Sequence, residues 1–395
     1  MILGAGPAGL TFANKLLEMG EEDFLVIEKE DIAGGLCKSV FVDGSDLDVG
    51  GGHFLDVRRP EVVDFLFQFM PEEEWNIFDR DSQIFIHDTY IGHPFEANIW
   101  QLPDKLQQMY LDSIKTAGCN RNVEKPEKFT EWIRWKLGDA IADNYMLPYN
   151  RKMYGDLLDE LGTYWLDKLP NVSYEDTLKS CREHRPYGSQ PGHARFYYPK
   201  EYGFGEVFRR MADRLGDKLI CNTVVNKLDI NNRTVNDEFE ASYIITTIPW
   251  TSVDSIICDD EKILTEISNL KHTGIYVDYF SKNMDTAAQW IYYPEESIVF
   301  HRILVRHNFL PGSSGYWTET RDKRHDEMGL DSSFSYRNEY AYPLNIIGKN
   351  ESIAGILDYC GRQNVIGLGR WGEWQHFNAD AVIARSLELA KKLNN

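Results

Sequence analysis

The sequence predicts an α/β fold with an α+β insert: a first domain on buried parallel strands, a helical subdomain and a second, mixed β-sheet. Three observations lead to this expectation. A short apolar strand runs into the glycine-rich turn Gly4–Gly9, and a helical pattern follows it. Apolar residues recur at helical spacing between 103 and 171. Residues 84–95 and 273–309 alternate between apolar and polar side chains, as half-buried strands do.

Length and charge limit the function before any motif is considered. A chain of 395 residues is long enough for two or three domains. Its formal net charge of −20 repels nucleic acid and anionic membranes, so we expect neither as a partner. An anionic substrate would need local arginines to overcome this background.

Cysteine usage and hydropathy indicate the compartment. The six cysteines are scattered and none forms a CxxC pair or a metal-like cluster, so we expect free thiols, no metal site and a reducing cytoplasm. No apolar run approaches the roughly 18 residues of a membrane helix, and no signal peptide is recognisable. We therefore predict a cytoplasmic protein with no membrane association.

The first turn carries a nucleotide-binding pattern. Gly4-Ala5-Gly6-Pro7-Ala8-Gly9 matches G-x-G-x-x-G, in which glycine allows a tight turn and close approach to a pyrophosphate at a helix N-terminus. The apolar strand 24–27 then ends at Glu28, where a ribose-binding carboxylate is expected. Gly34-Gly35 follows and leaves backbone room beside a dinucleotide. The first strand, 1–4, is short for a central strand; it is either clipped or preceded by further residues.

Three later segments extend the pattern: a strand-like stretch at 219–228 containing Val225, an apolar strand at 243–248, and a strand at 364–368 that leads to Gly369-Arg370. This distribution resembles the FAD-containing superfamily that includes amine oxidases, protoporphyrinogen oxidases and UDP-galactopyranose mutases. The resemblance implies a Rossmann-like FAD-binding domain assembled from discontinuous segments, and it favours FAD over NAD.

The resemblance also suggests domain boundaries. We expect FAD-binding segments at 1–80, 199–255 and 348–395, a mixed-sheet segment at 81–102, a helical substrate subdomain at 103–198 and a mixed-sheet substrate domain at 256–347. Within the helical subdomain, the apolar stripe at 129–141 is predicted to be mostly core. The acidic run 71–74 is predicted to be a solvated helix start.

A more specific resemblance covers nearly the whole chain. Segments similar to motifs of the UDP-galactopyranose mutases, especially the eukaryotic-type ones, occur in order at Gly50–Phe54, His93–Ile99, Tyr145–Tyr154, His193–Pro199, Trp290–Glu296, Ala341–Pro343 and Gly369–Trp374. Amine oxidases would be expected to share only the cofactor segments.

This resemblance implies a reduced-FAD-dependent mutase that interconverts pyranose and furanose forms of a nucleotide-diphosphate sugar. Flavin N5 would act as nucleophile at the anomeric carbon, without net oxidation. An electron donor such as NAD(P)H would reduce the flavin, and the product would feed polysaccharide synthesis. A homodimer is left open. Arginine and tyrosine side chains would donate the hydrogen bonds that stabilise the departing diphosphate. The implied catalytic residues are His53, Arg302, Tyr342 and Arg370.

The remaining candidate residues also follow from the resemblance. Implied substrate contacts are Phe95, Glu96, Asn150, Tyr154, Trp165, Lys168, His193, Trp290, Tyr292 and His376. Implied cofactor contacts are Gly4, Gly6, Pro7, Ala8, Gly9, Glu28, Lys29, Gly34, Gly35, Leu36, Gly51, Gly52, His53, Val225, Gly369, Arg370, Asn378 and Asp380.

Departures from the mutase pattern fall on the substrate contacts. His376 stands where tyrosine is expected, Lys168 lies near the place of a missing second diphosphate arginine, and His193 replaces an asparagine. Lysine cannot form the bidentate fork of arginine. Glu96 replaces an amide near the nucleobase; an ionised carboxylate only accepts hydrogen bonds, which suits guanine better than uracil. These changes suggest a different base or sugar.

Other interpretations stay open. Arg302 could be a sheet-edge ion-pair residue, and Tyr342 could be a turn aromatic. The shared cofactor segments also fit an FAD-dependent amine oxidase or protoporphyrinogen oxidase-like oxidoreductase. A third interpretation is an FAD-binding protein that has lost activity.

Overall fold

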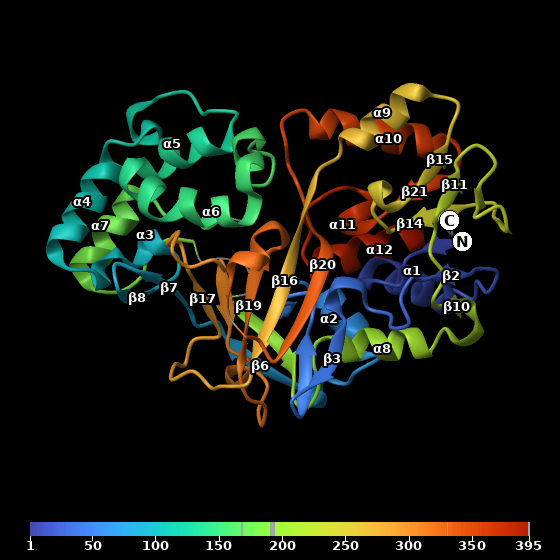
Figure 1. Ribbon diagram of the computed structural model, residues 1–395, viewed down its shortest axis with the longest axis horizontal. Helices are drawn as coiled ribbons and strands as arrows, with labels where there is room; N and C mark the ends of the chain where they lie inside the picture. The colour runs from blue at the N-terminus through green and yellow to red at the C-terminus, as the bar shows by residue number, and fades with distance from the viewer. Residues whose placement is uncertain (167–168, 190–193, 330, 394–395) are drawn as a thin grey trace.

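A parallel sheet with helices on both faces lies at one end of the molecule, and a lobe of helices lies at the other (Figure 1). A seven-stranded sheet stands between them. The computed structural model describes residues 1–166, 169–189, 194–329 and 331–393. The predicted fold class, α/β with a Rossmann-like part, helices and a mixed sheet, is confirmed.

The parallel sheet has five strands in the order β10-β2-β1-β14-β21. They are β10 (Leu219–Ile220), β2 (Val26–Ile27), β1 (Ile2–Leu3), β14 (Ile244–Thr246) and β21 (Val365–Gly367). β1 is central and pairs in parallel with β2 on one side and β14 on the other. The turn after β1 therefore stands where the strand order reverses, the position at which open α/β sheets bind ligands.

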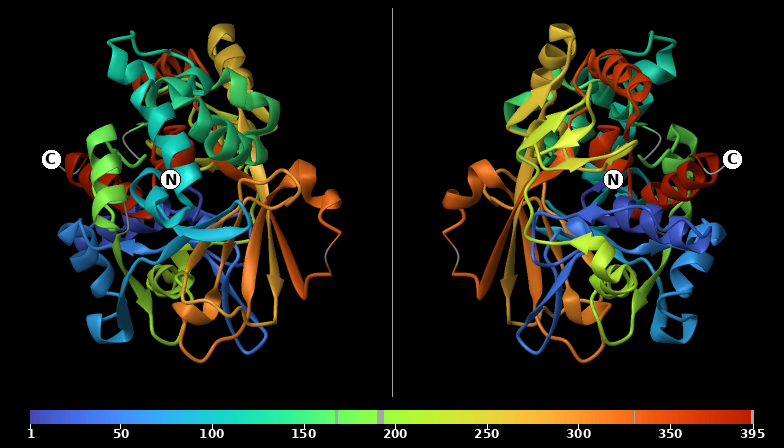
Figure 2. Two further views of the ribbon diagram at one scale, coloured as in Figure 1. Left: turned by 90° about the vertical axis from the view of Figure 1, so that its left-hand side faces the viewer. Right: turned by 90° about the vertical axis from the view of Figure 1, so that its right-hand side faces the viewer.

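Neighbouring residues of β1 face opposite layers, because side chains alternate along a strand. Ile2 packs in a core with helices α1 (Pro7–Glu18) and α12 (Ala379–Leu393), which lie side by side (Figure 2). Leu3 packs in a second core with α9 (Glu261–Asn269) and α10 (Lys349–Arg362). The strand is thus buried on both faces, which explains its wholly apolar sequence.

The stretch 219–228 is divided between two sheets. Its first residues form β10, whereas β11 (Lys227–Asp229) belongs to a four-stranded sheet with β12 (Thr234–Val235), β13 (Phe239–Glu240) and β15 (Ser255–Ile257). Val225 lies between the two strands and is buried in the second core.

The seven-stranded sheet is mixed, as predicted. Its order is β20 (Phe334–Pro343), β16 (His272–Phe280), β19 (Tyr316–Arg321), β18 (Arg302–Leu304), β17 (Trp290–Tyr292), β7 (Ser82–Ile86) and β8 (Thr89–Gly92). β17 and β7 are parallel, and the other neighbouring pairs are antiparallel. Smaller sheets are formed by β3 (Ser39–Val42) with β4 (Ser45–Asp48), and by β5 (Leu55–Asp56), β9 (Arg195–Pro199) and β6 (Trp75–Asp79).

The helical lobe contains α3 (Phe95–Asn98), α4 (Asp104–Lys115), α5 (Phe129–Ile141), α6 (Leu147–Tyr154) and α7 (Tyr174–Glu183). The predicted apolar stripe on α5 is buried, from Phe129 to Ile141. The helix bends at Gly138, whose φ is 76° and where a Cβ would lie 2.4 Å from the Ser113 carbonyl oxygen. The range 103–198, expected to be helical, ends within strand β9.

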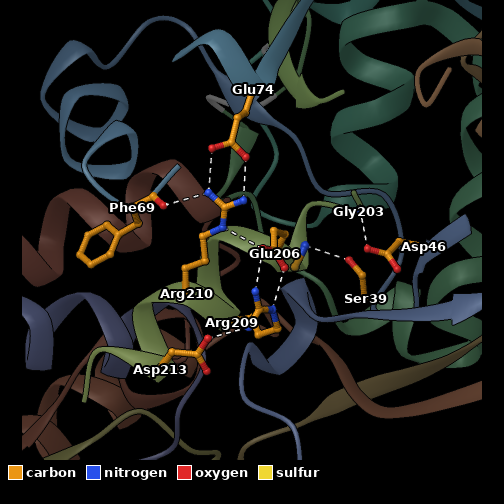
Figure 3. Close-up of polar contacts among 10 residues, drawn as sticks. Ser39, Asp46, Phe69, Glu74, Gly203, Glu206, Arg209, Arg210 and Asp213 are labelled. Atoms are coloured by element: carbon orange, nitrogen blue, oxygen red, sulfur yellow. Dashed lines mark hydrogen bonds and ion pairs between the residues drawn. The ribbon is translucent and has the colours of Figure 1, made fainter. Parts of the chain in front are cut away.

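The run 71–74 is a largely exposed segment that contains the short helical turn Glu72–Glu74, in agreement with the predicted solvated helix start, and its last residue also forms an ion pair. Arg210 on α8 (Gly205–Asp213) donates to both carboxylate oxygens of Glu74, at 2.9 and 2.6 Å, and also to Glu206 at 2.8 Å (Figure 3). It reaches the Phe69 carbonyl as well, at 3.3 Å. This fork connects α8 to the segment that enters β6.

Asp48 is a buried carboxylate at the end of β4. It accepts hydrogen bonds from the Ser39 hydroxyl at 2.6 Å, the Tyr198 hydroxyl at 2.8 Å and the Phe204 N–H at 3.0 Å. Burial raises the pKa of Asp48 to about 7, although these donors oppose the rise. The native state therefore binds this proton more tightly than the unfolded chain does.

Asp48→Asn is expected to flatten one part of the pH dependence of stability. Because the folded pKa of Asp48 is raised, its contribution falls as pH rises from about 4 to about 7. Relative to wild type, Asp48→Asn should be more favourable at pH 8 than at pH 5 by roughly 2–3 kcal/mol of unfolding free energy. Urea titrations at both pH values measure this difference; parallel pH profiles for the two proteins would contradict it.

Candidate active site

A cavity of about 330 Å³ lies where the helical lobe, the seven-stranded sheet and the C-terminal segment meet. It brings together all four predicted catalytic residues, His53, Arg302, Tyr342 and Arg370. Predicted substrate contacts in its wall are Phe95, Glu96, Asn150, Tyr154, Trp165, Trp290, Tyr292 and His376. Lys168 and His193 lie outside the described residues.

Arg302 projects from β18 and forms an ion pair across the sheet. Its Nη2 lies 2.6 Å from Glu319 Oε2, because Arg302 and Glu319 stand opposite each other on β18 and β19. Burial alone would raise the pKa of Glu319, but the Arg302 guanidinium and His301 hold it at about 2. Arg302 Nε is buried and has no acceptor among the described residues. The guanidinium is therefore held in place with a donor left over.

Two tyrosines and a second arginine stand beside it. Arg302 Nη2 lies 3.5 Å from the Tyr342 hydroxyl on β20. Arg80, in the loop before β7, donates from Nη2 to the Tyr292 hydroxyl at 2.6 Å, and its guanidinium lies 4.8 Å from the centre of the Trp290 ring. Arg80 lines the same cavity, so two cationic groups lie near the two tyrosines.

The glycine run before His53 is required by the protein's own packing. A Cβ on Gly51 would lie 2.9 Å from Glu319 Oε1, and one on Gly52 would lie 2.2 Å from Leu304 Cδ2. The Gly52 N–H also donates to Glu319 Oε1 at 3.2 Å. Glu319 thus contacts both the His53 loop and the Arg302 guanidinium, and it couples their positions.

His53 is neutral at physiological pH. Burial, and then the positive charge of Arg370, lower its pKa to about 4. Its Nδ1 lies 3.0 Å from the Gly51 carbonyl oxygen, which can only accept a hydrogen bond. Nδ1 therefore carries the proton, and Nε2 is left as an acceptor.

Arg370, in the short helix α11 (Gly369–Gly372), is bound by backbone carbonyls. It donates to the Phe377 oxygen from Nε at 2.9 Å and Nη2 at 2.7 Å, and to the Ala341 oxygen from Nη1 at 3.0 Å. Carbonyls orient the guanidinium without cancelling its charge. Burial lowers the pKa of Arg370, but arginine keeps its proton, so a fixed positive charge stands beside His53.

The turn after β1 has the geometry of an anion-binding cradle. Gly4 has a φ of 98°, and a Cβ on Gly9 would lie 2.0 Å from the Gly4 carbonyl oxygen, so both positions require glycine. Across residues 1–18, all of which the structure describes, no acidic side chain lies in the first turn of α1 and no side chain caps the helix. Its N–H groups are thus available to a phosphate.

Some of the other predicted cofactor residues pack against this turn, and the rest lie in the cavity wall or elsewhere. Gly35 packs against Gly6, with 3.0 Å from a built Cβ to the Gly6 Cα, and Gly369 packs against Ala8. Glu28 follows β2 and accepts from the Ala5 N–H at 2.8 Å. Gly52, His53, Arg370 and Asn378 line the cavity, Gly34 lies beside the Ala5 carbonyl, Leu36 is half-buried against Gly50, and Lys29 is exposed.

Asp380 offers a further position, on the helix that packs against α1. It is the second residue of α12, and its Oδ2 accepts from Arg59 Nε at 2.8 Å. Its Oδ1 is buried with no partner among the described residues. A buried carboxylate oxygen without a donor is costly, so it is a place for a ligand hydroxyl or N–H.

The opposite end of the cavity is aromatic. The Phe95 and Tyr145 rings stack with centroids 5.3 Å apart, and Trp132 lies in the same wall. Asn150 is turned to the backbone, donating to the Met146 oxygen at 2.7 Å. Glu96, at the start of α3, also lines this end.

Several site residues were not predicted from the sequence. Arg80, Tyr149 and Tyr145 line the cavity, and Glu319 forms the ion pair that positions Arg302. Tyr145 and Tyr149 lie within the segment Tyr145–Tyr154, and its similarity to a mutase motif is the sequence feature that points to them. Arg80 falls in the run Asp79-Arg80-Asp81, which is typical of an exposed turn.

Comparison with known proteins agrees with this architecture. Residues 2–69 match the family model of an NAD(P)-binding Rossmann-like domain. The chain is also similar in structure to a putative protoporphyrinogen oxidase from Exiguobacterium sp. 255-15, with a TM-score of 0.70 and 13% identity over 99% of this chain and 97% of that chain. Cyclohexylamine oxidase from Brevibacterium oxydans IH-35A is similar with a TM-score of 0.64 and 14% identity, covering 100% and 99%.

A more similar structure is that of a reduced UDP-galactopyranose mutase. The TM-score is 0.89 at 23% identity, covering 100% of this chain and 93% of that chain. The chain therefore has the UDP-galactopyranose mutase fold, as the sequence predicted. None of the helices in the described part of the chain combines the length and hydropathy needed to span a bilayer.

Proposed function

We propose that this protein binds FAD and, with FAD reduced, interconverts the pyranose and furanose forms of a nucleotide-diphosphate sugar. One observation carries the proposal. Three guanidinium groups, those of Arg80, Arg302 and Arg370, line one cavity in a protein whose net charge is −20. Such a local concentration of fixed positive charge suits a diphosphate.

The residues present fit FAD. The glycine turn Gly4–Gly9 and the free N-terminus of α1 suit its pyrophosphate, and Glu28 suits a ribose. The unpaired Oδ1 of Asp380 offers an acceptor. His53 and Arg370 would border the flavin ring. In this proposal the FAD-binding domain comprises 1–80, 199–255 and 348–395, which supply the five strands of the parallel sheet. Bound reduced FAD supplies a nucleophilic nitrogen, N5, for the anomeric carbon.

Arg302 binds the departing diphosphate. Negative charge grows on the diphosphate as the bond to the anomeric carbon breaks, and a guanidinium fixed in a buried site stabilises that charge without reorganising. Glu319 fixes the guanidinium through the 2.6 Å contact, and Nε remains a donor. The Tyr342 hydroxyl, buried beside Arg302, accepts from Arg302 Nη2 at 3.5 Å and keeps its own proton to donate to the diphosphate.

His53 and Arg370 act at the other side of the cavity. The neutral His53 offers Nε2 as an acceptor, and its fixed tautomer prevents it from adding positive charge. Arg370 holds a positive charge close to it. Arg370 favours an electron-rich, anionic partner in this position, and the His53 acceptor favours one that also presents an N–H or O–H.

The same charges oppose an amine oxidase function, although amine oxidases share the fold. A cationic amine entering the cavity would meet three guanidinium groups, and like charges in a partly buried site repel strongly. The alternative oxidoreductase function is therefore less well supported than the mutase function.

A screen of sugar nucleotides tests the proposal. Flavin-loaded protein reduced with dithionite, or with NAD(P)H as the proposed donor, should convert at least one UDP-, GDP- or dTDP-sugar to its furanose form, detected by chromatography. Oxidised protein should not. Bleaching of the flavin by an amine with peroxide release, and no furanose with any sugar nucleotide, would contradict the proposal.

A further inference from the structure

Glu96 is a buried carboxylate with no cationic partner. It is only 8% exposed and lines the cavity; its carboxylate accepts from its own backbone N–H, and among the described residues no other side chain forms a hydrogen bond or ion pair with it. The positive charge of Lys136 acts on it from a distance, and Lys136 itself is bonded to Asn171 Oδ1 at 2.9 Å. Burial raises the pKa of Glu96, so its ionised form is costly until donors reach it.

Glu96 lines the aromatic part of the cavity, where Phe95 and Tyr145 stack. Ring contacts run in series from Phe95 to Tyr145 at 5.3 Å, from Tyr145 to Tyr149 at 6.1 Å, and from Tyr149 to Tyr292 at 5.6 Å. Tyr292 is bonded to Arg80. A ligand whose phosphates lie at the arginines can therefore extend along aromatic side chains, which suit the flat face of a base.

We propose that Glu96 selects a guanine nucleotide, by accepting hydrogen bonds from N1–H and the 2-amino group of the base. The inference rests on the proposed function, since it identifies the base of that substrate. An ionised carboxylate offers two acceptors side by side. Among the common bases, guanine presents two adjacent donors on its Watson–Crick edge. Uracil presents one N–H between two carbonyl oxygens, which would face the carboxylate unfavourably.

The arrangement makes the discrimination large. A bidentate, charge-assisted pair in a buried site is strong, and a base that cannot supply the donors leaves the carboxylate unpaired. Sites built in this way reject analogues that lack the hydrogen-bonding group far better than apolar pockets reject a missing methyl group. Inosine isolates one of the two bonds, because it keeps N1–H and lacks the 2-amino group.

Calorimetric titration of the reduced, flavin-loaded protein with GDP, IDP and UDP tests the proposal. GDP is expected to bind at least about 100-fold more tightly than UDP, and IDP about 10- to 100-fold more weakly than GDP. In Glu96→Gln the preference for GDP over UDP should fall by at least about tenfold, since an amide supplies one acceptor and one donor. Glu131→Gln, an exposed change on α5, is the matched control and should keep the wild-type preference.

The outcomes separate this inference from the function on which it rests. If UDP binds as tightly as GDP, the guanine assignment is wrong and the mutase function stands. If no nucleoside diphosphate binds the reduced protein, the proposed function itself fails. Flavin content and the thermal midpoint show whether Glu96→Gln is folded; if it is not, the GDP, IDP and UDP series on the wild type still decides the question.

Discussion

Arg302→Ala is expected to lower kcat by about 10²- to 10³-fold while flavin content is retained. The guanidinium contacts the diphosphate in the proposed reaction, and it lies outside the glycine turn that would hold the flavin. The diphosphate is already anionic in the bound substrate and gains further negative charge as its bond to the anomeric carbon breaks, so the contact with Arg302 strengthens in the transition state and its loss lowers kcat. Turnover of the sugar nucleotide by the reduced variant, together with its visible absorption spectrum, measures both quantities.

The loss of the Arg302 guanidinium must be distinguished from the effect of leaving Glu319 without its partner. Glu319 is buried, and it is the Arg302 guanidinium, with His301, that lowers its pKa to about 2 although burial alone would raise it. Arg302→Met combined with Glu319→Gln removes the pair together and should restore the thermal midpoint without restoring turnover. Arg302→Lys keeps the charge and should recover part of kcat. Normal turnover in Arg302→Ala would show that the diphosphate site is elsewhere.

Local sequence patterns were sufficient to predict the fold class. The run Gly4–Gly9 predicts its own conformation because Gly4 and Gly9 leave no room for a Cβ. Wholly apolar short strands indicate burial on both faces, as β1 and β2 show. Pairing between distant strands left no such signal. β9 inserts between β5 and β6, from which it is separated by about 115 to 140 residues, and β7 lies parallel to β17, about 210 residues further along the chain.

The site residues also fall into two groups, those that local sequence motifs predict and those that depend on distant partners. Arg302, Tyr342 and Arg370 were found because they lie within or close to recognisable motifs, and all three line the cavity. Arg80 and Glu319 were missed because their roles depend on long-range partners. Arg80 sits among aspartates in a polar turn and gains its function from Tyr292. Glu319 looks like an outward-facing strand residue until β18 places Arg302 opposite it.

The glycine run Gly50–Gly52 has a physical reason within the protein itself. A run of glycines beside a candidate site residue can mean that a ligand approaches closely. In the structure, a Cβ on Gly50 would lie 1.8 Å from the Leu36 carbonyl oxygen, and those on Gly51 and Gly52 would meet Glu319 and Leu304. The glycines are required by the protein's own packing, and this packing positions His53 in the cavity wall.

Arg306→Ala is expected to destabilise the protein by roughly 3–5 kcal/mol. Arg306 is completely buried, and its guanidinium donates to the carbonyls of Val42 at 3.0 Å, Ser45 at 3.2 Å and Ser314 at 2.8 Å. It also bonds the Tyr279 hydroxyl at 2.6 Å. One side chain thus fastens the β3–β4 hairpin to the seven-stranded sheet, and its removal leaves several buried acceptors without donors.

Urea and thermal unfolding, with Arg209→Ala as the matched control, measure this effect. Arg209 also forms several charged contacts, to Glu206 and Asp213, but its side chain is 56% exposed, so its loss should cost less than about 1 kcal/mol. Arg306→Lys should fall between the two, because lysine keeps a charge but cannot reach carbonyls on both sides of the fork. Equal stabilities for Arg306→Ala and Arg209→Ala would show that the hairpin is held by its apolar contacts alone.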